Sequence, residues 1–291
     1  MVNRNLQKTG LYLLLALVSA CSTVETRRTA ETAPAPVPAP APAPLPQVTG
    51  SAPQNDNCSV GCPTGGSNVT LVRTAYTLNN DAQTKFAKWV AYRVTKDTPY
   101  PNRPRNWKTD PDIPAGETLD DADYDLAHDT LKTDRGHQAN LASMAGVSDW
   151  QTLNYLSNIT PQKSDLNQGA WARLEDKERT LVKQPGIDSV YVLTGTLYER
   201  YIGTLPSTTK QHTIPSGYWK IIFTNSTPTE GTFAAFIMDQ DTPRAANFCN
   251  YQVTVEEIEQ RSGLKVWTTL PAAEQAALKP VHGQLGKDIG C

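Results

Sequence analysis

The sequence has few long hydrophobic runs and no excess of basic residues. The apolar stretch Leu11–Val18 is too short to cross a bilayer, and no other segment is long and apolar enough to do so. Lys and Arg together number 27, against 29 Asp and Glu. This balance argues against a protein that coats or regulates nucleic acid, although it does not exclude an enzyme that binds a few phosphates locally. No internal repeat is evident.

The N-terminal residues are typical of a secretory signal. Arg4 and Lys8 form a short basic region before the apolar stretch, and Val18-Ser19-Ala20-Cys21 resembles the lipobox of bacterial lipoproteins. We therefore expect a signal peptide over residues 1–20 and acylation of Cys21. Ser22 after the cysteine favours the outer membrane of the cell envelope. The alternative is an ordinary cleaved signal with a chance cysteine at its boundary, which would give a secreted protein.

A linker and one domain are expected after the signal. Residues 21–57 include a tract from Ala33 to Pro46 that is dominated by Ala and Pro, which stays extended and acts as a semi-rigid spacer. Residues 58–291 then leave 234 residues, enough for one domain with a sizeable core. Removal of the signal leaves 25 basic and 29 acidic side chains, a net charge of −4.

The five cysteines fit an exported protein. If Cys21 carries lipid, four remain, an even number that suits an oxidising compartment. A disulfide between Cys58 and Cys62 would close a tight local loop, and one between Cys249 and Cys291 would attach the C-terminus to the body of the domain. The alternative is a zinc site with four thiolates, for which two distant single cysteines are poorly spaced.

The expected fold class is α+β around a mainly antiparallel sheet, because strands and helices are mixed without a repeating strand–helix unit. The predicted strands are rich in β-branched and aromatic residues. They are residues 69–72, 89–94, 190–194, 218–223 and 232–237.

Two helices and one long loop are also predicted. Residues 166–182 have helical spacing, with Asp165 as N-cap and Gln168 three residues later. Thr254 and Glu257 form a second capping box, opening a helix that Gly263 would end. Residues 100–121 are crowded with Pro, Asp and Asn and are expected to form an irregular loop, which at this length is often functional.

The segment Thr133-Asp134-Arg135-Gly136-His137 is the first of two that carry the chemistry. Histidine titrates near neutrality and can take a proton from water. The missing side chain of Gly136 lets the backbone turn or approach another group closely. The chain has only four histidines, and of these only His137 follows an Asp-Arg-Gly sequence.

The second segment runs from Asn167 to Arg179. An amide oxygen in the first turn of a helix is either a capping group or a hard ligand that Mg²⁺ accepts. Glu175 lies eight positions later, about 80° round a regular helix, and so faces the same cleft. Arg179 either pairs with Glu175 on the surface or reaches a phosphate, which suits its planar fork. Arg105 has the same two interpretations.

Together, these motifs resemble those of the DNA/RNA non-specific endonucleases. The resemblance rests on Asp-Arg-Gly-His at 134–137, on Ser157-Asn158-Ile159-Thr160-Pro161-Gln162, and on Leu166-Asn167-Gln168-Gly169-Ala170-Trp171 with Glu175. It extends from about Asn57 to Cys291. It implies a ββα-metal site, in which the histidine lies on or beside a strand and the asparagine on the following helix.

The resemblance also implies a role for each site residue. His137 corresponds to the general base, and Asn167 to the single direct protein ligand of one Mg²⁺, with Mn²⁺ as an alternative ion. Glu175 corresponds to the carboxylate that orients the waters of the cation. Arg105 and Arg179 correspond to arginines that contact phosphate or stabilise the transition state. Arg135 corresponds to a motif arginine required for activity, and Asn158 corresponds to a polar residue of the site. Asp134 is expected to order its loop, and the family pairs its cysteines as above.

The expected activity is therefore magnesium-dependent hydrolysis of DNA and RNA to 5′-phosphate ends. Contacts to phosphate and sugar carry little sequence preference. One rival is a surface lipoprotein that binds extracellular nucleic acid without cutting it; another is a phosphodiesterase acting on smaller nucleotides. Retention of the histidine and of the metal ligand favours the enzyme over the binding protein. A lipid anchor and a homodimer are the other associations considered.

Overall fold

The computed structural model describes residues 55–67 and 69–291. The expected signal peptide, Cys21 and nearly all of the expected linker lie outside these residues. Among the described residues, no helix combines the length and the apolar character needed to span a bilayer.

The centre of the domain is a seven-stranded antiparallel sheet with the order β1-β2-β3-β6-β7-β8-β9. A separate antiparallel pair joins β4 to β5. This confirms the predicted α+β class. The strands are β1 (Val69–Val72), β2 (Thr77–Asp81), β3 (Phe86–Val94), β4 (Thr133–His137), β5 (Ile159–Lys163), β6 (Val190–Leu197), β7 (Gly217–Thr224), β8 (Phe233–Asp239) and β9 (Gln252–Val253).

The five predicted strands are all present, most of them longer than expected. Strand β2 was missed because its sequence, Thr-Leu-Asn-Asn-Asp, is poor in strand-forming residues. Its asparagines are buried: the Nδ2 of Asn79 donates to the backbone oxygens of Ser67 and Val69, and the Nδ2 of Asn80 donates to the backbone oxygen of Glu117. Tertiary contacts override propensity here.

Both faces of the large sheet are buried, as the alternation of side chains along β3 and β7 shows. Val90, Tyr92 and Ile222 pack toward one core, which includes Leu174 and Leu181 of the helix α4 (Ala172–Leu181). On the opposite face, the second core is built around six aromatic side chains and the helix α5 (Val255–Ser262). Those aromatic residues are Trp89, Tyr191, Trp219, Phe223, Phe233 and Trp267.

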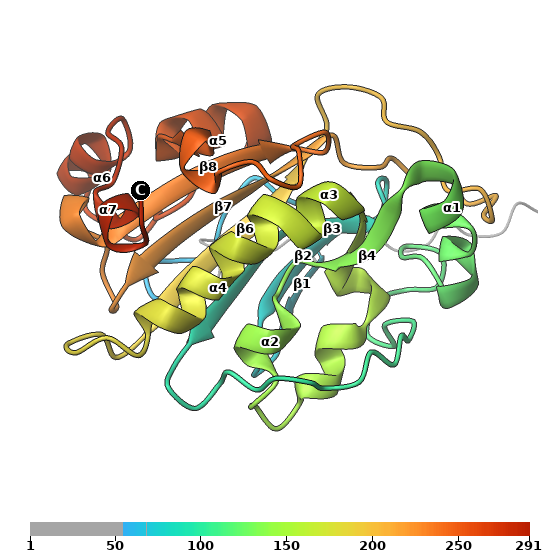
Figure 1. The fold of residues 1–291 in the computed structure, drawn as a ribbon, viewed down its shortest axis with the longest axis horizontal. Helices are drawn as coiled ribbons and strands as arrows, with labels where there is room; N and C mark the ends of the chain where they lie inside the picture. The colour runs from blue at the N-terminus through green and yellow to red at the C-terminus, as the bar shows by residue number, and fades with distance from the viewer. Residues whose placement is uncertain (1–54, 68) are drawn as a thin grey trace, which may run out of the picture. The chain divides into compact units, whose positions relative to one another are not determined.

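Helices lie against the sheet, and α4 lies over one of its faces (Figure 1). The helices are α1 (Ala127–Leu131), α2 (Leu141–Met144), α3 (Ser164–Leu166), α4 (Ala172–Leu181), α5 (Val255–Ser262), α6 (Ala272–Leu278) and α7 (Leu285–Asp288). The oxygen Oγ1 of Thr254 accepts a bond from the Glu257 amide, and Gly263 ends α5 with φ of 71°. This helix begins and ends where predicted, but Glu257 does not complete the capping box: its Oε1 accepts a bond from Arg261 Nη1 at 3.0 Å.

The predicted helix over 166–182 differs at its start. It begins at Ser164, and Asn167–Trp171 form a wider π-helical turn between α3 and α4. Asp165 is not the N-cap: its carboxylate accepts a bond from Arg244 Nε at 3.0 Å. The wide turn changes the angle between Asn167 and Glu175 from that of a regular helix, and such turns are common at functional sites.

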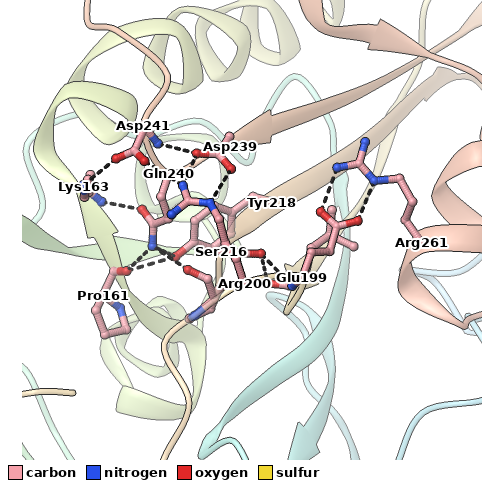
Figure 2. Close-up of polar contacts among 12 residues, drawn as sticks. Pro161, Lys163, Glu199, Arg200, Ser216, Tyr218, Asp239, Gln240, Asp241 and Arg261 are labelled. Atoms are coloured by element: carbon pink, nitrogen blue, oxygen red, sulfur yellow. Dashed lines mark hydrogen bonds and ion pairs between the residues drawn. The ribbon is translucent and has the colours of Figure 1, made fainter. Parts of the chain in front are cut away.

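The short pair β4–β5 is attached to the large sheet by a buried glutamine. Gln240 is fully buried; its Oε1 accepts from the amide of Lys163, and its Nε2 donates to the carbonyl oxygens of Pro161 and Pro215 (Figure 2). Around it, Lys163 and Arg200 pair with Asp239 and Asp241. These contacts fix the end of β5 from which α3 and the Asn167 turn begin.

The cysteines form two disulfides, Cys58–Cys62 and Cys249–Cys291, with Cα–Cα distances of 4.9 and 5.2 Å. The predicted pairing is therefore confirmed, and the alternative of a four-thiolate zinc site is excluded.

Candidate active site

A cleft of about 810 Å³ brings the two sequence motifs together. His137 ends β4, which pairs with β5 in antiparallel register, and Asn167 follows α3 directly after β5. The lining includes Tyr100, Arg103, Arg105, Trp107, Asp134, Arg135, His137, Asn140, Asn167 and Glu175. The predicted irregular loop, residues 100–121, supplies one wall.

Gly136 shows why this position carries no side chain. A Cβ placed there would lie 2.6 Å from Gln162 Oε1, a contact that cannot be accommodated without a shift. The glycine therefore allows the β4 backbone to approach β5 closely, one of the two possibilities inferred from the sequence.

His137 is oriented by a residue that sequence reasoning missed. Its Nε2 lies 3.2 Å from Asn154 Oδ1, and Asn154 Nδ2 donates to the Pro104 carbonyl at 3.0 Å, which fixes the direction of the amide. With Nε2 donating to Asn154, Nδ1 carries the lone pair. The Trp107 ring packs beside the imidazole at a centroid distance of 5.3 Å.

The imidazole is held in its neutral form. Burial lowers the pKa of His137 to about 4. The hydrogen bond that His137 donates to Asn154 opposes this shift, whereas the nearby charge of Arg105 adds to it. A neutral histidine with one nitrogen fixed as donor can accept a proton at the other nitrogen.

Asp134 positions the amide of Asn167. One carboxylate oxygen accepts from Asn167 Nδ2 at 2.9 Å and from Gln168 Nε2 at 2.7 Å, while the other accepts from Ser164 Oγ. Although burial opposes ionisation, these bonds hold the pKa of Asp134 below its usual value. The ionised carboxylate fixes the Asn167 amide through its nitrogen, and the Asn167 side-chain oxygen has no hydrogen-bond partner among the described residues.

Glu175 lies on α4 and reaches the same cleft. Its Oε2 accepts a bond of 2.6 Å from Asn140 Nδ2. Burial and the neighbouring Glu178 raise the pKa of Glu175 to about 7, whereas Lys220 and Arg179 oppose the rise. Glu175 therefore changes its protonation state near neutral pH.

A buried charge pair lies directly beneath Glu175. Lys220 Nζ is 2.6 Å from Glu178 Oε1 and 3.8 Å from Glu175 Oε1, and both Lys220 and Glu178 are completely buried. The hydroxyls of Tyr92 and Ser143 also donate to Glu178. Sequence analysis missed this cluster, although a lysine in the middle of a strand with both faces buried requires a partner.

Arg105 and Arg135 both line the cleft. Arg105 is exposed and has no carboxylate within ion-pair distance among the described residues. Arg135 is paired with Asp121 at 2.7 Å, and its guanidinium lies over the rings of Trp107 and Tyr124. Arg105 is thus the freer of the two to bind an anion.

Arg179 and Asn158 are not among the residues that line the cleft. Arg179 does not pair with Glu175 directly: it pairs with Asp176 and donates to Asn140 Oδ1 at 2.9 Å. Asn140 therefore links it to Glu175. Asn158 is fully buried, and its amide bonds only to backbone groups of Ala139 and Leu153. In this structure Asn158 supports the segment after His137.

The side chains of the cleft determine which kind of metal ion could bind there. Among residues 55–67 and 69–291, no group of three or more His, Cys, Asp or Glu side chains forms a metal site. The cleft instead presents the unpartnered amide oxygen of Asn167 and the carboxylate of Glu175. Hard oxygen ligands of this kind suit Mg²⁺, which keeps several waters and takes few protein ligands.

A cleft that joins a neutral imidazole, the guanidinium group of Arg105 and oxygen ligands is suited to phosphodiester hydrolysis, and the chain is a hydrolase of the nuclease class. It belongs to the DNA/RNA non-specific endonuclease family, which matches residues 53–273.

Individual relatives agree with this assignment. The chain is 62% identical over 237 residues to a nuclease of Serratia marcescens, covering 81% of this chain and 89% of that protein. It is 27% identical over 208 residues to human mitochondrial endonuclease G, covering 66% and 67% of the two chains. The fold is similar to that in a crystal structure of the EndoG/EndoGI complex, with a TM-score of 0.62, 23% identity, and coverage of 75% of this chain and 92% of that chain.

Proposed function

We propose that this protein hydrolyses DNA and RNA without sequence preference in a magnesium-dependent reaction that leaves 5′-phosphate ends. The observation that carries the proposal is the convergence of His137 and Asn167 on one cleft, each oriented by a second side chain, Asn154 and Asp134 respectively. Phosphate-directed contacts and a water nucleophile would allow both nucleic acids to be cut at one site.

The protein groups have separate tasks in the proposed reaction. His137 takes a proton from water at Nδ1, since Nε2 is committed to Asn154. Arg105 binds the scissile phosphate and its developing charge. Asn167 would hold the cation through its side-chain oxygen, and Glu175 would orient the surrounding waters. When bound, Mg²⁺ would supply charge neutralisation at the phosphate.

One assay tests this function. Circular double-stranded DNA and, separately, RNA are incubated with the protein, with and without a chelator, and the ends of the products are mapped. We expect both substrates to be cut only when magnesium is free, with phosphate at the 5′ ends. Binding of nucleic acid without cleavage would instead indicate the capture protein, and cleavage of small diesters alone would indicate a nucleotide phosphodiesterase.

We further propose that Cys21 is acylated and that the domain is tethered to the outer membrane. The support is the lipobox-like sequence followed by the Ala/Pro tract. Replacement of Cys21→Ala should move the protein from the membrane fraction to the soluble exported fraction and abolish incorporation of labelled fatty acid. Equal membrane association of both proteins would contradict the proposal.

A further inference from the structure

A second cationic position lies in the same cleft, on the wall formed by the loop after β3. Tyr100, Pro101, Asn102 and Arg103 line the cleft together with His137. The Arg103 guanidinium carbon lies 4.1 Å from the ring centroid of Tyr100 and 4.6 Å from that of Trp150. Two aromatic rings therefore hold this side chain in place.

The guanidinium of Arg103 is held but not neutralised. Its Nε donates to the carbonyl oxygen of Ala145 at 3.3 Å, and no carboxylate lies within ion-pair distance of it among the described residues. By contrast, Arg135 and Arg179 each pair with an aspartate. Because Arg103 is fixed through Nε and the two rings, its terminal nitrogens remain available to an anion.

Arg103 and Arg105 occupy different parts of the cleft wall. The charge of Arg105 contributes to the electrostatic environment of His137, whereas Arg103 is held against Trp150 and the end of α2. Tyr100, beside Arg103, keeps 47% of its surface exposed, which is unusual for a large aromatic side chain in this protein. An exposed ring next to an unpaired guanidinium is the combination that binds a base together with its phosphate.

We propose that Arg103 binds a phosphate of the substrate strand outside the scissile linkage, and that Tyr100 stacks on a neighbouring base. The inference rests on the proposed nuclease function and extends it, because it assigns a flanking-nucleotide subsite to a named pair of residues. The enzyme then recognises a strand several nucleotides long rather than a single diester.

The test measures kcat/KM for single-stranded oligonucleotides from a dinucleotide to about twenty nucleotides, a span that exceeds typical single-strand sites. For Arg103→Gln we expect a loss of roughly tenfold on the longest substrates, the size of one charge-assisted contact. The shortest substrate that the unmodified enzyme cleaves should be cut at an unchanged rate. On the longest substrates, the kcat/KM of Arg103→Lys should lie between those of the unmodified enzyme and Arg103→Gln. Lysine keeps the positive charge but lacks the planar guanidinium group that can donate two parallel hydrogen bonds.

Salt dependence gives a second readout that misfolding would not imitate. Loss of one phosphate contact should reduce the slope of log(kcat/KM) against log[salt] by about 0.7 on single strands. The matched control is Lys183→Gln, which removes one exposed positive charge from a residue that does not line the cleft and should change neither readout. Tyr100→Leu should lower kcat/KM on long single strands, while Tyr100→Phe should not.

Three results would overturn the subsite: an equal loss at every length, no loss at any length, or an unchanged salt slope in Arg103→Gln. If the unmodified enzyme cleaves none of the substrates, the proposed function itself fails. Inorganic phosphate provides the remaining comparison. If it inhibits the unmodified enzyme equally at every length, and Arg103→Gln relieves that inhibition, then Arg103 binds free phosphate rather than the strand.

Discussion

The neutral state of His137 has a consequence for stability as well as for catalysis. Its pKa is about 4 in the folded protein, against an ordinary value of 6.5. The unfolded chain therefore binds a proton at a higher pH than the folded chain does, and stability falls as the pH drops from about 6.5 to about 4. Below that range this group causes no further loss.

The prediction is that His137→Asn removes this part of the pH dependence. Urea unfolding in the presence of a chelator, repeated across the same pH range, measures the effect. His282→Asn is the matched control, because His282 is exposed and outside the cleft. Parallel stability curves for the unmodified protein and His137→Asn would contradict the lowered pKa of His137.

At the scale of elements, the pair Lys220–Glu178 joins the middle of β7 to α4 beneath the site. Lys220→Met would leave Glu178 as a buried carboxylate without its cation, and we expect a loss of about 3–5 kcal/mol in the free energy of unfolding. The double variant Lys220→Met with Glu178→Gln should recover most of that loss, because the amide can still accept from Tyr92.

A double-mutant cycle by urea unfolding checks this expectation. Additive losses in the double variant would show that the two side chains do not act as a pair. The cycle should also report on the site, since Lys220 lies close to Glu175.

The site residues that lie within short sequence motifs were predicted better than those whose positions depend on distant parts of the chain. Strand alternation and capping residues indicated most of the large sheet and the helix α5. The prediction that His137, Asn167 and Glu175 face one cleft is confirmed, because they lie in motifs whose spacing is set by two local elements. Asn154 and Lys220 were not found, because their roles depend on contacts with residues distant in the chain.

The start of the site helix shows a different limit. A capping pattern at Asp165 predicted a regular helix, but the Asp165 carboxylate accepts a hydrogen bond from Arg244 instead. Gly169 also allows the Arg244 backbone to approach closely, because a Cβ at Gly169 would lie 2.6 Å from the Arg244 carbonyl oxygen. Residues far along the chain therefore set the wide turn at Asn167. Local sequence patterns carry no information about such contacts.

At the scale of the whole molecule, the two disulfides differ in the length of chain they close. Cys249–Cys291 spans 42 residues and Cys58–Cys62 only 4. In the chain-entropy description, the longer loop contributes about 4 kcal/mol and the shorter about 2 kcal/mol. We therefore expect the Cys249→Ser/Cys291→Ser variant to unfold at lower urea than Cys58→Ser/Cys62→Ser. The opposite order would show that loop entropy does not govern their contributions.

The central claim is that His137 and Asn167 act on the same phosphodiester. The most direct measurement is kcat for plasmid cleavage by His137→Ala, by Asn167→Ala and by the double variant, at saturating magnesium. We predict a loss of about 10²- to 10⁴-fold for His137→Ala. The double variant should be little slower than the worse single variant, because groups that act as a unit are strongly non-additive. Near-normal cleavage by His137→Ala, or losses that simply multiply, would contradict the account.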